Sequence, residues 1–175
     1  MPYTNTGSGP LTNNPMIEWD GSYEACTPDT GQTGIKIGVL VYRSASASAN
    51  AITLASAYRG YELEDASEIG IVVGPPSAPW MPQTYDYNTT AATAATDTVW
   101  VHWLKLGDVM WLISGSISVT YGQTMWCAAN GLVALTAAGT TADKYNCHLW
   151  EAKLTTSSKT AQLGKYIGMG AVDTS

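Results

Sequence analysis

The segment Gly38-Val-Leu-Val-Tyr42 opens a three-part pattern that occurs twice in the chain. In the first copy it is followed by Ala51-Ile-Thr-Leu-Ala-Ser-Ala57 and then by Ile69-Gly-Ile-Val-Val-Gly74. The second copy consists of Gly122-Gln-Thr-Met-Trp126, Leu132-Val-Ala-Leu-Thr-Ala-Ala138 and Ile167-Gly-Met-Gly-Ala171. Short aliphatic runs separated by turn residues are typical of β-strands. The repeat therefore predicts two related β units.

The residues around the repeat also show strand periodicity. Apolar residues alternate from Ile35 to Tyr42, which predicts a strand with one deeply buried face. The runs 98–106 and 109–113 flank Gly107-Asp108 and predict a hairpin. Both faces of the run 98–106 are apolar, so we expect a central strand between two layers. The insertion 139–163 contains a further strand candidate, His148-Leu-Trp-Glu-Ala-Lys153.

No segment carries a sustained apolar stripe of helical period and length. The sequence therefore predicts an all-β protein, an antiparallel β-sandwich or barrel-like domain built from the two Gly-led units. Residues 17–175 would form this β domain, either as one body or as two lobes, 17–88 and 98–175. Residues 1–16 are rich in Pro, Gly and Asn and predict a flexible arm. That arm is either a simple tail or a segment that adds a strand to a partner's exposed edge.

Composition excludes several classes of function. The chain has 175 residues, of which only 13% are charged, so its surface must consist largely of neutral polar groups. A net charge of -6 argues against nucleic-acid binding, which needs clustered Lys and Arg. No run approaches the length needed to cross a bilayer. The first residues lack the pattern of a secretory signal, which predicts synthesis in the cytoplasm of the producing cell.

The sequence offers few groups for catalysis or metal binding. His102 lies between tryptophans and is expected to be a packed, hydrogen-bonded residue, and His148 cannot form a dyad with its neighbour Cys147, because adjacent strand residues face opposite ways. Cys26, Cys127 and Cys147 lack zinc spacing. We expect buried free thiols, with a Cys127–Cys147 bridge as the alternative. The sequence thus predicts no catalytic residue, no metal site and no cofactor, although a carboxylate pair assembled in space stays open.

Aromatic residues indicate where a partner could bind. The chain has seven Trp and ten Tyr but no Phe, a choice that suits wet interfaces and sugar-stacking platforms. Five tryptophans lie in predicted strands and are expected in the core: Trp100, Trp103, Trp111, Trp126 and Trp150. The proline-rich loop 75–87 is either a lid over the core or a contact for a partner. The predicted partner-binding residues are Pro2, Tyr3, Thr4, Asn5, Leu11, Trp19, Trp80, Met81, Tyr85 and Tyr87.

The repeat resembles the β units of decoration, or head-stabilising, proteins of tailed-phage heads. The resemblance rests on residues 37–41, 51–57 and 69–73 and on 122–126, 132–138 and 167–171, about half of the chain. It implies a non-enzymatic virion protein that binds the major capsid protein at the outer capsid surface through an arm and loops. It also implies a homo-oligomer, with a trimer favoured. The chain's size, its tryptophans and the regions 106–121 and 139–163 depart from that pattern.

Other functions compete with capsid decoration. A carbohydrate-binding β-sandwich could use exposed Trp and Tyr, and Trp80 would be its test residue. Another minor head or tail protein of a virion is a closer alternative, whereas a major capsid subunit would need a long helix. An enzyme ranks third, since it would depend on an acid pair that one sequence does not reveal.

Overall fold

The computed structural model describes residues 16–18, 22–32, 34–35, 37–44, 50–55, 69–74, 98–115, 118–135, 147–157 and 161–170, and the statements below concern these residues. They form eleven strands and one short 3₁₀ turn, which confirms the all-β, barrel-like prediction. The elements are β1 (Met16–Glu18), β2 (Glu24–Pro28), β3 (Leu40–Arg43), β4 (Ala51–Leu54), β5 (Ile69–Gly74), β6 (Val99–Trp103), β7 (Val109–Ile113), β8 (Thr124–Cys127), η1 (Ala129–Gly131), β9 (Val133–Ala134), β10 (Cys147–Ala152) and β11 (Ala161–Gly170).

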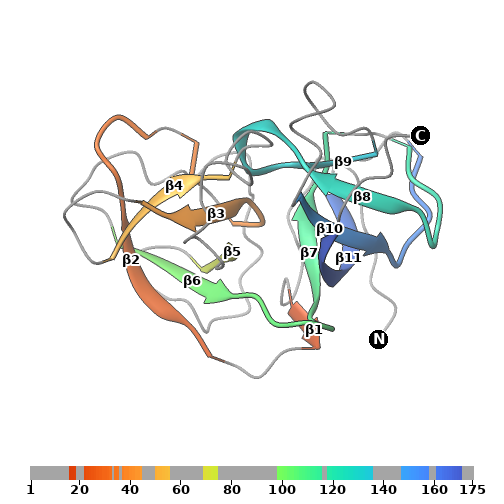
Figure 1. Cartoon of the computed structure of the whole chain (residues 1–175), viewed down its shortest axis with the longest axis horizontal. Helices are drawn as coiled ribbons and strands as arrows, with labels where there is room; N and C mark the ends of the chain where they lie inside the picture. The colour runs from red at the N-terminus through yellow and green to blue at the C-terminus, as the bar shows by residue number, and fades with distance from the viewer. Residues whose placement is uncertain are drawn as a thin grey trace.

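The first half of the chain closes into a five-stranded barrel in the order β2-β4-β3-β5-β6 (Figure 1). β2 pairs with β4 in parallel and with β6 in antiparallel orientation, and the remaining pairs are antiparallel. β6 therefore has a partner on each side, as expected of a central strand. We call this body the first barrel.

The second half forms a sheet in the order β1-β7-β11-β10-β8-β9. Its β7 and β9 ends meet, because Ser114 after β7 forms a parallel bridge with Val133 of β9. Gly115 also donates its N–H to the Val133 carbonyl at 2.8 Å. The strands β7-β9-β8-β10-β11 thus make a second barrel, closed by a single bridge, and β1 adds to the free edge of β7.

The two barrels have the same topology. If the strands of each barrel are numbered 1 to 5 along the chain, both barrels have the order 1-3-2-4-5. Strands 1 and 3 are parallel in both, and strand 5 pairs with strand 1 to close the barrel. The closing contacts also match, because the parallel pair Pro28 and Ile52 in the first barrel corresponds to Ser114 and Val133 in the second. The predicted pair of related β units is therefore present as two barrels of equal connectivity.

The predicted correspondence between the copies is right for two segments and wrong for the third. β3 is equivalent to β8 and β4 to β9, as the repeat indicated. The equivalent of β5 is β10, from the insertion, whereas Ile167-Gly168 lies in β11, the equivalent of β6. Gly168 has a φ of 97° and follows a shift in the β10–β11 register. The Ile-Gly pair of the second copy thus belongs to a bulge, where a left-handed residue favours glycine.

The predicted hairpin at Gly107-Asp108 does not form. β6 belongs to the first barrel and β7 to the second, so the turn joins two barrels instead of two paired strands. The strand predicted from Ile35 to Tyr42 is also shorter, since the chain turns at Ile37 and Gly38 and β3 begins at Leu40. Both faces of that strand are buried, rather than one.

Each barrel encloses its own hydrophobic cluster. The first barrel buries Cys26, Val41, Ile52, Val72 and Val101 together, and the second buries Met110, Leu112, Met125, Val133 and Trp150. Outward residues of the first barrel join the second cluster: Leu40, Tyr42, Ile69, Ile71 and Val73. The barrels are therefore packed on one another through β3 and β5.

Candidate functional site

A charged and aromatic cluster lies at one end of the first barrel. Glu24 begins β2, Arg43 ends β3 and Trp103 ends β6, and cross-strand register places them together on the face that points into the barrel. Arg43 donates from Nη1 and Nη2 to the two carboxylate oxygens of Glu24, at 3.2 and 2.7 Å. Trp103 Nε1 donates to Glu24 Oε2 at 2.6 Å. We call these three residues the first-barrel end.

The first-barrel end is ordered but accessible. The guanidinium carbon of Arg43 lies 4.1 Å from the centroid of the Trp103 ring, within cation–π range. The hydrogen bond from Arg43 holds the pKa of Glu24 below its usual value. The side chains of Glu24 and Arg43 are each 34% exposed, so a partner could reach both charges. A fixed Arg–Trp pair with solvent access suits contact with another molecule better than covalent chemistry.

The equivalent end of the second barrel is sealed. The matched registers place Met110 where the first barrel has Glu24, Cys127 where it has Arg43, and Tyr166 where it has Trp103. All three second-barrel residues are buried. The two ends differ in burial because β3 of the first barrel covers this end of the second barrel. At the first-barrel end, Glu24 and Arg43 stay in contact with solvent.

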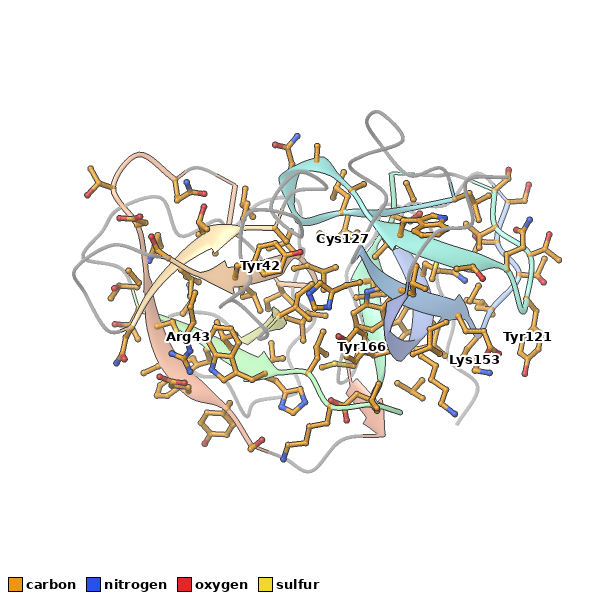
Figure 2. The ribbon with its side chains drawn as sticks, viewed as in Figure 1. Tyr42, Arg43, Tyr121, Cys127, Lys153 and Tyr166 are labelled. Atoms are coloured by element: carbon orange, nitrogen blue, oxygen red, sulfur yellow. The ribbon has the colours of Figure 1, made fainter. Side chains whose placement is uncertain are left out.

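A buried polar cluster lies where the first barrel covers the second. Tyr42 donates its hydroxyl to Cys127 Sγ at 4.0 Å, and its ring lies 5.7 Å from that of His148. His148 Nδ1 and the Tyr166 hydroxyl share a hydrogen bond at 2.7 Å. Figure 2 shows Tyr42, Cys127 and Tyr166 gathered at the centre of the molecule. Burial lowers the pKa of His148 to about 4 and raises the pKa of Tyr166 to about 12, so both are neutral at pH 7.

A Ser–His–Asp arrangement occurs at the junction of the barrels. His102 Nε2 lies 2.7 Å from Asp108 Oδ2, and Ser22 Oγ lies 3.4 Å from His102 Nδ1. Nδ1 is also 2.7 Å from the Ser22 carbonyl oxygen, which can only accept, so this nitrogen must donate its proton there. A nitrogen that donates cannot remove the hydroxyl proton of Ser22. The arrangement ties β6 to the β6–β7 turn, and His102 is the packed, hydrogen-bonded residue that the sequence predicted.

The ten predicted partner-binding residues lie outside the described part of the chain. These are Pro2, Tyr3, Thr4, Asn5, Leu11, Trp19, Trp80, Met81, Tyr85 and Tyr87. Of the tryptophans predicted in the core, Trp111 and Trp150 are buried, whereas Trp100, Trp103 and Trp126 are half-buried. The core prediction is therefore correct for two of the five.

Sequence reasoning missed Glu24 and Arg43. A signal for Arg43 is present, because it continues the alternation of Ile37, Val39 and Val41 and places a charge on an otherwise apolar face. Glu24 has no such signal, since only the β2–β6 register brings it beside Trp103 and Arg43. Cys26 is a buried free thiol and Cys127 is buried, whereas the side chain of Cys147 lies outside the described residues, so the alternative Cys127–Cys147 bridge stays a prediction. Burial raises the pKa of the Cys26 thiol to about 12.

Comparisons with known proteins add no family assignment. No protein-family model matches the chain, and no curated protein matches it in sequence. Within the described ranges, no three His, Cys, Asp or Glu side chains gather in a way that could hold a metal ion. None of the described helical structure is long and apolar enough to cross a membrane.

Proposed function

We propose that the chain is a non-enzymatic structural protein that decorates the outer surface of a viral capsid and stabilises the head. Its partner is the major capsid protein, its location is the virion, and it works as a homo-oligomer, with a trimer favoured. The observation that carries a binding role for the chain is the first-barrel end, where the side chain of Arg43 is 34% exposed and stacks on Trp103. Arg and Trp are enriched among the residues that dominate protein–protein binding energy.

The state of the histidines supports a binding role. His102 is fixed between Asp108 and the Ser22 carbonyl, and His148 is buried against Tyr166. Neither imidazole is free to act as a general base in these positions. The neutral polar surface that the composition demands costs little to desolvate against another protein.

The capsid contacts are assigned to the N-terminal arm and to the loop 75–87. Met16, the last residue of the predicted arm 1–16, pairs with Met110 in the sheet. Deletion of residues 1–15 therefore keeps β1 in the chain. We expect this truncated protein to unfold at the same urea concentration as the full chain and to lose capsid binding.

Co-sedimentation with undecorated capsids tests the proposal. The full chain should pellet with capsids, and the truncated chain should stay in the supernatant. Failure of the full chain to pellet would reject capsid decoration. Pelleting of both proteins would reject the arm as the capsid contact, while leaving the loop 75–87 to be tested by Trp80→Ala.

A carbohydrate-binding function is the second candidate, and Tyr121 favours it. This residue lies in a turn and is 61% exposed, and Lys153 Nζ is 5.3 Å from the centroid of its ring. An exposed ring beside polar groups is the kind of platform on which sugars stack. Glycan-array binding that is lost in Tyr121→Ala or Trp80→Ala would favour this function. If the chain is instead found in purified phage tails that carry no heads, that result would support the alternative of another minor virion protein.

A further inference from the structure

The contact between the two barrels defines two surfaces. One is the outward face of β3 and β5, with Leu40, Tyr42 and Ile71, and the other is the end of the second barrel around Cys127. η1 completes the contact, because Gly131 donates its N–H to the Ala55 carbonyl at 2.7 Å. A Cβ at Gly131 would lie 2.5 Å from the Leu40 carbonyl oxygen, so the approach requires glycine. The outward face of β3 and β5 in the first barrel thus covers the Cys127 end of the second barrel.

The equal topology gives each of these surfaces a counterpart. The counterpart of the covered end is the first-barrel end. The counterpart of the covering face is the outward face of β8 and β10, which we call the β8/β10 face. Matched registers give its residues, each equivalent to one of Leu40, Tyr42, Ile69, Ile71 and Val73: Thr124, Trp126, Leu149, Glu151 and Lys153. These residues are exposed or half-buried.

The two counterpart surfaces have complementary chemistry. The β8/β10 face carries Glu151 and Lys153, which form an ion pair with side chains 35% and 23% exposed. The first-barrel end carries Glu24 and Arg43, and each surface adds a half-buried tryptophan, Trp126 or Trp103. Aromatic residues and Arg are enriched in interfaces between proteins, and the rims of such interfaces are polar. Figure 2 places Arg43 and Lys153 toward opposite ends of the molecule, so one chain cannot join its own two surfaces.

We propose that the β8/β10 face of one copy docks on the first-barrel end of a second copy and so repeats the contact between the two barrels within each chain. This contact joins unlike surfaces, and successive copies close into a ring if the rotation allows it. The inference rests on the proposed function, since it names the partner of the same first-barrel end within the decorating oligomer.

Paired charge reversal tests the contact. E24R/R43E reverses the first-barrel end and keeps an ion pair there, and E151K/K153E does the same on the β8/β10 face. We expect either double variant to weaken self-association about tenfold or more by sedimentation velocity, because like charges then meet. The chain with all four substitutions should recover association, since opposite charges meet again. Recovery would not follow from a general loss of stability.

Controls separate this contact from other surfaces. Leu106 is 75% exposed, and Leu106→Ser should leave self-association unchanged. Each variant's melting temperature shows whether it folds, and Lys153→Glu alone replaces the double variant if that protein is unstable. A monomer at all concentrations, equal association in all charge variants, or loss of association in Leu106→Ser would overturn the proposal. The assay contains no capsids, so its failure is distinct from failure of capsid binding.

Discussion

Gly38 and Gly122 hold the same position in the two barrels. Their φ angles are 85° and 83°, and each donates its N–H to a carbonyl of the fourth strand, that of Val72 at 2.9 Å and that of Ala152 at 2.8 Å. The return bonds also match, from Val72 N–H to the Val39 carbonyl and from Ala152 N–H to the Gln123 carbonyl. The glycine that leads both copies of the sequence pattern is therefore required by backbone conformation.

Replacing either leading glycine should destabilise its barrel. A left-handed φ costs a residue with a Cβ about 1 kcal/mol or more, so we expect Gly122→Ala to lower the free energy of unfolding by about that amount. No heavy atom lies within 4 Å of a Cβ at Gly122, so the loss there reports conformation alone. Urea denaturation measures it. Unchanged stability in Gly122→Ala would show that the turn relaxes at no cost.

Glycines on the inner faces should be intolerant for a different reason. A Cβ at Gly70 would lie 2.4 Å from Val101 Cγ1, and one at Gly164 would lie 2.8 Å from Leu112 Cδ1. We expect each alanine variant to lose about 1–3 kcal/mol of unfolding free energy through overpacking. Gly115→Ala is the matched control, because its nearest contact would be 3.6 Å. Equal midpoints for all three variants in urea would contradict this packing.

His148 should make stability depend on pH. The folded-state pKa of about 4 lies below the ordinary histidine pKa of 6.5, so the unfolded chain binds more protons between these values. The contribution of neutral His148 is complete above pH 6.5, falls as pH drops through the window, and is lost below about 4. By linkage the change is about 3 kcal/mol. His148→Gln should flatten the pH dependence of unfolding free energy across this window, and parallel curves for the two proteins would disagree with a buried neutral imidazole.

Asp108 should stabilise the junction between the barrels. Its Oδ2 lies 2.7 Å from His102 Nε2 and accepts from the Lys105 backbone N–H at 2.8 Å. Removing the carboxylate leaves the buried imidazole and the Lys105 N–H without this partner, so Asp108→Ala should cost about 1–3 kcal/mol. Asp108→Asn retains an acceptor oxygen and should cost less. Denaturation by urea ranks the two, and a reversed order would argue against the His102–Asp108 pair.

Much of the fold follows from local sequence signals. Alternation and β-branched residues predicted β4, β5, β6, β7 and β10, and the repeat predicted two related units. The third equivalence failed because β10 of the second copy carries Leu149-Trp-Glu where β5 has Ile69-Gly-Ile. Gly70 makes room for Trp103 in one barrel, whereas Gly164 makes room for Trp150 in the other. The glycine lies in β5, the fourth strand of the first barrel, but in β11, the fifth strand of the second. The sequences of equivalent strands therefore diverge, although a glycine packs against a tryptophan in both barrels.

The remaining errors concern contacts between distant segments. The turn at Gly107-Asp108 has hairpin composition, yet β6 finds its partners in β2 and β5 and β7 finds its partners in β1 and β11. Local turn chemistry does not encode that choice. The first-barrel end was missed for the same reason, because Glu24, Arg43 and Trp103 come from three strands. Residues 1–15 and the loop 75–87, which hold most of the predicted contacts, lie outside the described residues.

The equivalence of the two barrels is tested most directly by NMR couplings across backbone hydrogen bonds. We predict a coupling between the Gly122 amide nitrogen and the Ala152 carbonyl carbon, matched by one between the Gly38 nitrogen and the Val72 carbonyl carbon. A Gly122 coupling to a carbonyl within residues 167–171, the segment that the sequence repeat matched to 69–74, would contradict the two-barrel structure.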